Sequence, residues 1–331
     1  MARRIAILAT GGTIAGTRRA GDGYTAATLS GQELLSALPG CLPGIDVRCE
    51  QIANVGSQSM TGEIWLHLMH RINALQSAGS VDAIVVTHGT DTLEETAYFL
   101  HLTTLGKCPV ILTGAMKPAD AHAPDGPENL LHALTAAQQP ELAKAGVLVL
   151  MDGWLHSARY VYKTGNPDQA FVSWPSGPVG QIREGHAKLF HGGPDACHTF
   201  QSHFSNNADV AELANWPQVP VFYATAHTQP QWLASWLEQR PLALVVAGVG
   251  AGNVDIRLLD MLAQAVHQQV VVVRSSHCDM GRVARNIEID DDRFGFIAAG
   301  DLNPQKARVL LMVALAAQTP VSLLQQVFNT Y

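Results

Sequence analysis

The sequence predicts an α/β protein with a larger N-terminal parallel-sheet domain and a smaller C-terminal α/β domain. Up to about residue 185, short apolar or β-branched runs alternate with amphipathic segments of roughly 10 to 18 residues, which is the pattern of βαβ units. Residues 186–217 lose this rhythm and are rich in His, Gly, Pro, Asn and Ser. Strand-like and helical runs then alternate again to the end of the chain.

The expected elements follow from these runs. In the first domain the strands are Arg4–Ala9, Ile45–Ile52, Ala83–Thr87, Val110–Thr113 and Gly146–Met151. The clearest helix is Thr61–Gln76, because Ile64, Leu68, Ile72 and Leu75 recur at helical spacing. In the second domain we expect strands at Val219–Thr225, Leu242–Ala247 and Val270–Arg274, and closing helices at Pro304–Ala316 and Val321–Asn329. The predicted division is an N-terminal domain over 1–190, a linker over 191–217 and a C-terminal domain over 218–331.

Composition excludes several classes of protein. The 331 residues include 21 basic and 28 acidic ones, a net charge of −7, without a basic run, so we expect no nucleic acid partner. The longest apolar stretches, such as Val309–Ala317, reach about half of the roughly 20 residues that cross a bilayer, so we expect no membrane partner either. Only 15% of residues are charged and 47% are hydrophobic, which predicts surface buried between subunits and hence an oligomer.

The N-terminus and the cysteines indicate a cellular compartment. The start, MARRIAILATGG, has too short an apolar part for a secretory signal and is typical of a first strand. The cysteines are odd in number and lack CxxC spacing, which argues against a disulfide framework and against a cysteine zinc site; they are Cys41, Cys49, Cys108, Cys197 and Cys278. We therefore expect a cytoplasmic protein, or a periplasmic one if a signal peptide was removed.

A first candidate site is TGGTIAG, Thr10–Gly16, at the end of the first strand. Its glycines let backbone N–H groups approach a ligand closely. A nucleotide site is not favoured, because GxGxxG is not matched and no GK[ST] follows. Taken alone, the motif is equally consistent with a tight turn in which the Thr13 hydroxyl is incidental.

A second candidate site follows the third strand, in THGTDTLEETA, Thr87–Ala97. Thr92 and Glu95 have capping-box spacing, which predicts a helix start with Thr90 and Asp91 exposed just before it. Ligands of parallel sheets bind beyond the carboxyl ends of strands, so the two threonine-bearing loops should meet in one crevice. Asp91 is then a candidate binder of a cation, although by itself it also fits a residue that stabilises the helix dipole.

With these motifs the sequence resembles the bacterial-type L-asparaginases and glutaminase-asparaginases. Both signatures are present, ATGGTIAG at Ala9–Gly16 and HGTDTLEETA at His88–Ala97. The similarity continues through NVGSQ at Asn54–Gln58, TGAMKP at Thr113–Pro118, DGPENL at Asp125–Leu130, YKTG at Tyr162–Gly165, AGVGAGN at Ala247–Asn253, RSS at Arg274–Ser276 and LNPQKARVLL at Leu302–Leu311. It therefore covers nearly the whole chain.

The resemblance implies an activity and an assembly. It implies hydrolysis of L-asparagine to L-aspartate and ammonia, with L-glutamine as a further substrate, in a catalytic N-terminal domain without cofactor or metal. It also implies a homotetramer built as a dimer of dimers. Thr13 resembles the primary nucleophile and Tyr24, in the loop after it, the residue that helps to activate it. Thr90, Asp91 and Lys163 resemble the second catalytic group.

Further residues of the resemblance bind the substrate. Ser57 and Gln58 are similar to contacts for its α-carboxylate and α-ammonium groups, and Asp91 also faces the ammonium. Asn253 and Glu288 match positions that reach the site from a neighbouring subunit. The chain departs from many family members at Ser59, where they carry an acidic residue, and in the loop TRRAGDG, Thr17–Gly23, which contains two arginines.

The chemistry of a threonine nucleophile leaves two questions open. Its hydroxyl needs a base within hydrogen-bond reach. For Thr13 the candidate is Tyr24, acting directly or by passing the proton to Glu288, and for Thr90 it is Lys163, which otherwise acts as a cation. We favour attack by Thr13, an acyl-enzyme and then hydrolysis by water, with the oxyanion held by backbone N–H groups and the Thr90 hydroxyl. Direct attack by a water that Thr90 orients is the alternative.

Other polar residues have simpler interpretations. No HExxH motif is present, and His67 and His70 are expected to face solvent on their helix. We expect His88 to be a structural hydrogen-bonding residue rather than a base. The acidic run Asp290–Asp292 lacks the spacing of a calcium loop and is expected to be a solvated turn.

Two other functions compete with the enzyme. A non-catalytic amino-acid sensor would keep the pocket without turnover, but Thr13, Thr90, Asp91 and Lys163 are all present. The amidase subunit of a tRNA-dependent amidotransferase carries extra N-terminal sequence, whereas this chain starts at its first strand. Release of ammonia from asparagine separates these functions.

Overall fold

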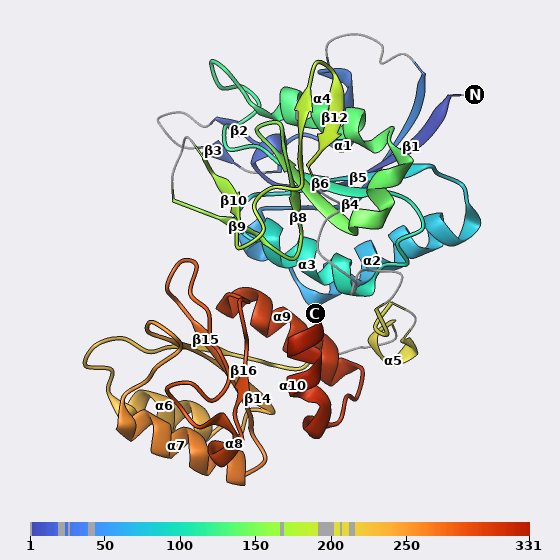
Figure 1. Cartoon of the computed structure of the whole chain (residues 1–331). Coiled ribbons are helices and arrows are strands. Elements are labelled where there is room, and N and C mark those ends of the chain that lie inside the picture. The colour runs from blue at the N-terminus through green and yellow to red at the C-terminus, as the bar shows by residue number, and fades with distance from the viewer. Residues whose placement is uncertain are drawn as a thin grey trace. The chain divides into compact units, whose positions relative to one another are not determined.

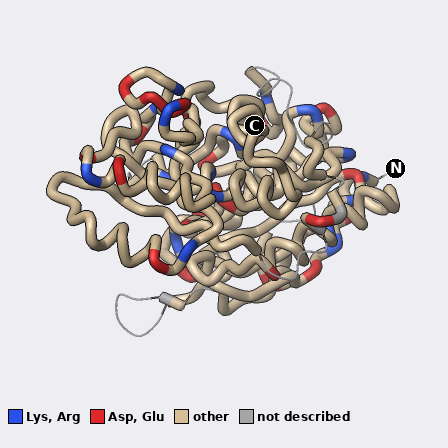
Figure 2. The backbone as a smooth tube through the Cα atoms, turned by 90° about the horizontal axis from the view of Figure 1, so that it is seen from below, with Lys and Arg blue, Asp and Glu red and all other residues tan. Residues whose placement is uncertain are grey.

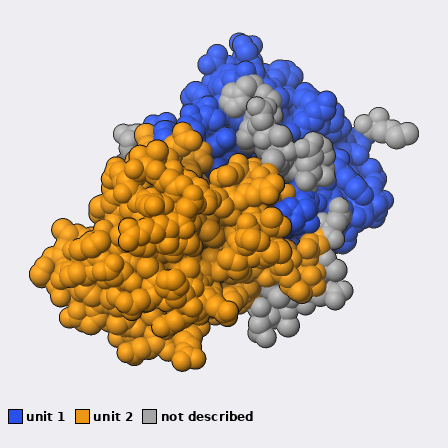
Figure 3. Space-filling view, turned by 60° about the horizontal axis from the view of Figure 1, so that its bottom comes forward, with its two compact units in different colours: residues 1–206 blue, residues 207–331 orange. Residues whose placement is uncertain are grey.

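The computed structural model of the chain describes residues 2–18, 24–25, 27–38, 44–165, 169–190, 202–205, 207–211 and 216–331. These residues divide into two compact units, residues 1–206 and 207–331 (Figure 3). Most of the predicted linker, 191–217, lies outside the described residues. The predicted boundaries at 190 and 218 therefore stay a prediction.

Unit 1 is built on an eight-stranded sheet in the order β12-β11-β8-β7-β6-β5-β1-β4. Its strands are β1 (Arg3–Gly11), β4 (Ile45–Val55), β5 (Ala83–Thr87), β6 (Val110–Thr113), β7 (Val147–Met151), β8 (Trp154–Ser157), β11 (Gly180–Arg183) and β12 (His186–Leu189). The five strands β7, β6, β5, β1 and β4 pair in parallel, whereas the first three of this order, β12, β11 and β8, are joined by antiparallel pairing. The predicted parallel sheet is confirmed, and the antiparallel extension is a feature that the sequence analysis missed.

Helices cover both faces of this sheet, with α1 (Gly31–Ser36) and α4 (Gly126–Ala137) on one face and α2 (Gly62–Ala78) and α3 (Leu93–Thr103) on the other (Figure 1). The predicted helix at Thr61–Gln76 is α2, and Thr61 caps it by accepting a hydrogen bond from Ile64 N–H. Two short ribbons and three 3₁₀ turns are the remaining elements among the described residues of the unit. They are β2 (Thr17–Arg18) with β3 (Tyr24–Thr25), β9 (Val161–Lys163) with β10 (Phe171–Ser173), and η1 (Thr13–Ala15), η2 (Ser57–Ser59) and η3 (Pro140–Ala145).

Two apolar layers hold unit 1 together. The layer under α1 and α4 joins buried strand residues such as Ile7 and Ile111 to Leu34 and Leu134. On the other face, the α2 and α3 rings of Trp65 and Phe99 stack with centroids 5.0 Å apart. Because both faces are covered, β5, β6 and β7 are buried at every residue. The sheet is therefore a rigid base for the loops at its strand ends.

Unit 2 has a four-stranded parallel sheet in the order β13-β14-β15-β16. Its strands are β13 (Val221–Tyr223), β14 (Ala243–Gly248), β15 (Val271–Ser276) and β16 (Ile297–Ala298). Its helices are α5 (Ala208–Ala211), α6 (Pro230–Leu237), α7 (Ile256–His267), α8 (Asp291–Phe294), α9 (Pro304–Ala316) and α10 (Val321–Thr330). Helices α6 and α7 lie on one face of the sheet and α9 and α10 on the other (Figure 1).

Most predictions for unit 2 are confirmed, and one is wrong. The three predicted strands and the two closing helices are present, and β16 is an addition. The acidic run is not a solvated turn: Asp290 caps α8, and Asp291 is fully buried against Arg274. No local sequence pattern indicates this pairing, because Arg274 is 17 residues away in the interior of a strand.

Candidate functional site

The centre of the candidate site is a lysine that binds a threonine and an aspartate. Lys163 Nζ donates hydrogen bonds to Thr90 Oγ1 over 2.9 Å and to Asp91 Oδ1 over 2.7 Å. Lys163 lies 72 residues after Asp91, so the fold brings together groups that the sequence keeps apart. The Asp91 side chain is 60% exposed and that of Lys163 is 24% exposed, so the carboxylate faces open space.

A buried glutamate, Glu94, binds the backbone of Lys163. Lys163 is the last residue of β9, and its backbone N–H donates to Glu94 Oε2 over 2.6 Å. Glu94 lies in the first turn of α3 and is only 6% exposed. It thereby ties β9 to the helix that follows Thr90 and Asp91. Glu94 was not among the predicted site residues, although it stands inside the second signature motif.

The loops after β1 and β5 touch through two glycines. The two strands are parallel neighbours, with Ala9 opposite Thr87, so both loops leave the same edge of the sheet. A Cβ atom added to Gly12 would lie 2.3 Å from Gly89 Cα. Only a residue without a side chain allows this approach, and the backbone of Gly12, with φ 85° and ψ −171°, is also one that glycine adopts. The predicted meeting of the two loops is confirmed.

The two threonines of these loops are both largely enclosed. Thr13 begins the 3₁₀ turn η1 and is 8% exposed, and Thr90 is 5% exposed. The prediction that Thr90 is exposed is therefore wrong, whereas Asp91 is exposed as predicted. Thr90 is covered because it lies against the loop after β6: a Cβ added to Gly114 would be 3.3 Å from Thr90 Cγ2.

Ser57 connects a third strand end to the same place. It follows β4, is 4% exposed, and its Oγ accepts a hydrogen bond from Asp91 N–H over 3.1 Å. Its carbonyl oxygen accepts from Thr92 Oγ1 over 2.8 Å. Thr92 is the N-cap of α3 as predicted. Its side chain makes no capping bond, because its hydroxyl donates to the Ser57 carbonyl oxygen instead, so the predicted capping box is wrong. Gln58 is exposed beside these groups.

One predicted catalytic side chain cannot be placed. The backbone of Tyr24 pairs with Arg18 in the β2–β3 ribbon, and its side chain lies outside the described residues, as does most of the arginine-bearing loop. The other two predicted site residues belong to unit 2. There Asn253 Nδ2 donates to Glu288 Oε2, which joins two loops that are 35 residues apart in sequence.

His88 is a buried structural residue. Its Nδ1 lies 2.6 Å from the carbonyl oxygen of Gly89, and Nε2 is buried. Burial lowers the pKa of His88 to about 4, against the opposing effect of the hydrogen bond to Gly89. The ring is therefore neutral at pH 7. His67 and His70 are exposed on α2, as expected.

Other features of the described residues bear on ligands. They include no group of three or more His, Cys, Asp or Glu side chains that could hold a metal ion. Nor does any described helix have the length and apolar character to cross a bilayer. Acidic and basic residues are interspersed along the described backbone (Figure 2).

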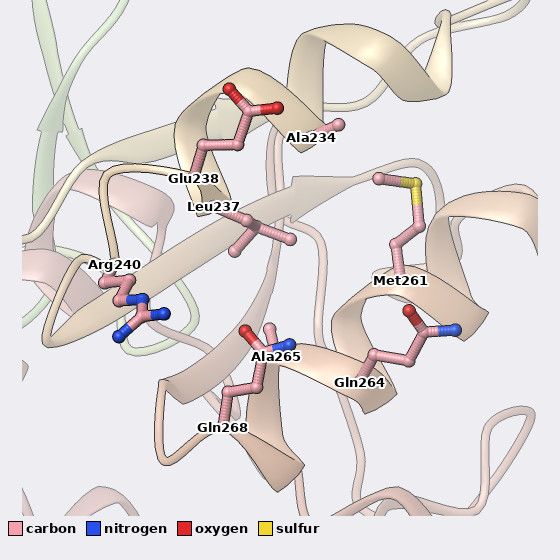
Figure 4. A pocket seen from close by; sticks show the side chains of 8 residues that line it. All are labelled: Ala234, Leu237, Glu238, Arg240, Met261, Gln264, Ala265 and Gln268. Carbon is pink, nitrogen blue, oxygen red and sulfur yellow. The ribbon is translucent and has the colours of Figure 1, made fainter.

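A cavity of about 380 Å³ in unit 2 lies between α6 and α7, where Leu237 and Met261 line it with Glu238 and Gln264 (Figure 4). It contains none of the predicted site residues.

The fold and the matching family models define the class of this protein as an amidohydrolase. The family model "Asparaginase, N-terminal" matches residues 4–193, and "Glutaminase/Asparaginase C-terminal domain" matches residues 218–328. The chain belongs to the asparaginase family.

Individual relatives are similar over nearly all of this chain and most of their own length. A protein of Haemophilus influenzae named "Probable L-asparaginase periplasmic" is 41% identical over 99% of this chain and 93% of its own. "L-asparaginase 2" of Escherichia coli is 40% identical with the same coverage. The crystal structure of a probable cytoplasmic L-asparaginase from Campylobacter jejuni superposes with a TM-score of 0.90 at 38% identity, over 99% of this chain and 100% of that one.

Proposed function

We propose that this chain hydrolyses the side-chain amide of L-asparagine to L-aspartate and ammonia through an acyl-enzyme on Thr13, and that it also accepts L-glutamine. The observation that carries the proposal is the contact of Lys163 with both Thr90 and Asp91, beside the loop of Thr13, in a chain of the asparaginase family. L-glutamine is included because the matching C-terminal family is named for both activities.

In the first step Thr13 Oγ forms a bond to the amide carbon. The carbonyl electron pair moves to oxygen, and backbone N–H groups and the Thr90 hydroxyl stabilise that charge. Thr90 is suited to this, since its oxygen accepts a hydrogen bond from Lys163 and its own O–H remains to donate. The Thr13 proton leaves through Tyr24. The carbon–nitrogen bond then breaks, and the nitrogen takes up a proton and departs as ammonia.

In the second step water attacks the ester carbon of the acyl-enzyme. Thr90 and Lys163 orient this water; the bond to Thr13 Oγ breaks and Oγ regains a proton. Lys163 Nζ donates to both the Thr90 hydroxyl and the Asp91 carboxylate. In this proposal Lys163 therefore acts as a cation that polarises Thr90 rather than as a base.

The polar groups around the threonines bind the ends of the substrate. Asp91, with its exposed carboxylate, faces the α-ammonium group, and Ser57 and Gln58 bind the α-carboxylate and α-ammonium groups. Asn253 and Glu288 of a neighbouring subunit complete the pocket for the ammonium end. No metal or cofactor takes part.

The test of the nucleophile is a comparison of kcat/KM for asparagine and glutamine in the wild type and in Thr13→Ala, with ammonia measured in a coupled assay. We expect near-complete loss in the variant. Thr135→Ala is the matched control, because that hydroxyl bonds only within α4, to Leu131 O. Acid-quenched enzyme should show a mass increase at Thr13. Activity retained by Thr13→Ala would exclude this nucleophile, and a fully active enzyme without any adduct would favour direct attack by water.

The same assay tests the competing function. An amino-acid sensor binds asparagine and releases no ammonia. Such a result would refute the enzyme and leave the pocket as a binding site.

The proposed assembly is a homotetramer, a dimer of dimers with shared active sites. Large apolar side chains of unit 2 that are more than half exposed support an oligomer: Trp232 at 60%, Ile256 at 64% and Ile287 at 73%. Mixing Thr13→Ala, which lacks the nucleophile, with Glu288→Ala, which should bind asparagine weakly, and letting subunits exchange should restore activity at low asparagine concentration, because hybrid sites combine an intact Thr13 with an intact Glu288. No recovery despite exchange would refute shared sites.

The proposed location is the cytoplasm, with the periplasm as the alternative. The described cysteines, Cys49, Cys108 and Cys278, are all free, which agrees with a reducing compartment. Cys41 and Cys197 lie outside the described residues. Fractionation of the native host tests this location.

A further inference from the structure

A buried ion pair lies at the base of the two loops of unit 2 that carry Asn253 and Glu288. Arg274 of β15 donates to Asp291 through Nε over 2.6 Å and through Nη2 over 2.8 Å. The two side chains are 1% and 0% exposed. Such a bidentate pair fixes the direction of both side chains as well as their distance.

The arginine also holds the first loop. Its Nη1 donates to the carbonyl oxygen of Gly252 over 3.0 Å, one residue before Asn253. Gly252 has φ +80°, and a Cβ there would lie 3.2 Å from that nitrogen, so the loop rests directly on the guanidinium. Asn253 and Val249 close the loop with two backbone hydrogen bonds of 2.8 and 2.9 Å.

The aspartate holds the second loop in the same way. Asp291 Oδ2 accepts a hydrogen bond from Asn286 N–H over 2.9 Å. Asn286 also bonds to Asp292 through its side chain in both directions. Glu288 therefore lies in a short segment, residues 286–292, whose ends are joined by the hydrogen bonds between Asn286 and Asp292. Above the ion pair, Glu288 and Asn253 meet through their own side chains.

We propose that Arg274 and Asp291 are positioning residues that hold Asn253 and Glu288 at the spacing that binds the substrate's ammonium end. A buried ion pair is an expensive way to stabilise a core, since apolar residues of similar volume often serve as well. Apolar residues, however, could neither donate a hydrogen bond to the Gly252 carbonyl oxygen nor accept one from Asn286 N–H, as Arg274 and Asp291 do. The inference rests on the proposed function, in which Asn253 and Glu288 contact substrate.

The test separates positioning from stability. The variant Arg274→Met/Asp291→Leu removes both charges, so it leaves no unpaired buried charge. We expect it to remain folded with KM for asparagine raised about tenfold, within the roughly hundredfold that a displacement of about 1 Å can cost, and with kcat nearly unchanged. Arg274→Lys is the second variant, because it keeps the charge but lacks the planar fork whose separate nitrogens donate to Asp291 and Gly252. The matched control is Arg257→Met, which breaks the exposed pair with Asp255 in the same unit.

A double-mutant cycle identifies the route of the effect. If Arg274 and Asp291 act through Glu288, adding Glu288→Gln to the double variant raises KM no further than Glu288→Gln alone. The inference is overturned if the folded double variant or the folded Arg274→Lys variant keeps the wild-type KM. It is also overturned if the KM increases of the double variant and of Glu288→Gln multiply when these substitutions are combined. If Glu288→Gln itself keeps the wild-type KM, the proposed role of Glu288 has failed, and the positioning role falls with it.

Discussion

The close approach of Gly12 and Gly89 allows a sharp test of the proposed active site. In Gly12→Ala the new Cβ would lie 2.3 Å from both Cα and N of Gly89, whereas ordinary contact begins at 3.4 Å. The two loops must therefore separate by about 1 Å, because both obstructing atoms belong to the backbone. A displacement of about 1 Å at a catalytic group can cost roughly a hundredfold in rate.

Backbone strain adds to the cost of this substitution. The φ of 85° and ψ of −171° at Gly12 lie in a region that is essentially restricted to glycine, and a residue with a side chain there costs about 1–3 kcal/mol. For a domain of this size each kcal/mol lowers Tm by about 2–4 °C. We expect Gly12→Ala to fold with a lowered Tm and to lose about two orders of magnitude in kcat/KM.

The control must carry a similar strain without the collision. Gly44 has φ +81°, and a Cβ there meets no atom within 4 Å. Gly44→Ala should therefore lower Tm but leave kcat/KM for asparagine unchanged in the ammonia-release assay. If folded Gly12→Ala kept the wild-type kcat/KM, the spacing of the two loops would not matter for catalysis, and the proposed meeting of Thr13 and Thr90 at one substrate would be refuted.

Three further predictions concern single side chains. Asp91→Ala should raise KM for asparagine by about fivefold, because an ionic contact at so exposed a carboxylate is worth roughly 1 kcal/mol; an unchanged KM in steady-state kinetics would contradict its binding role. Lys163→Met should lower kcat by about 10²–10³-fold, the range for losing a group that stabilises the oxyanion, whereas Lys144→Met, at an exposed lysine of the same unit, should have no effect; equal kcat values would remove Lys163 from the mechanism. His88 has a pKa lowered to about 4 by burial, so the unfolded chain binds its proton first, and stability should fall as pH drops from about 6.5 towards 4, by about 3 kcal/mol. Denaturant unfolding at several pH values should show this slope in the wild type and a shallower one in His88→Gln; the same slope in both would assign it to other groups.

The sequence predicts the central strands of both units because they are buried on both faces. Runs such as Ala83–Thr87 and Val110–Thr113 are continuous and apolar, and their ends match the structure residue for residue. The antiparallel strands β8, β11 and β12 escaped prediction, since each has only four residues and contains polar ones, buried in β8 and partly or fully exposed in β11 and β12. Such strands are defined by pairing with neighbours, which no local pattern reveals.

The site shows the same limit. Strand ends and glycines predicted that the loops after β1 and β5 meet, because parallel neighbours place their ends at one edge. The sequence could not predict that the Thr92 hydroxyl bonds to the Ser57 carbonyl oxygen instead of capping α3, since either bond would use the same hydroxyl. Nor could it show Glu94 behind Lys163, because that contact spans 69 residues.

The two units support their polar residues by different means, and this difference predicts how variants will behave. In unit 1 the threonines lie on backbone that is fixed by glycine contact and by the strand ends, so a disturbance there moves the reacting groups and lowers kcat. In unit 2 Asn253 and Glu288 are carried by loops that rest on one buried ion pair, so a disturbance there changes binding and raises KM. A variant of Arg274 that lowered kcat while KM stayed constant would contradict this division, because it would mean that unit 2 takes part in the chemical step and not only in holding the substrate.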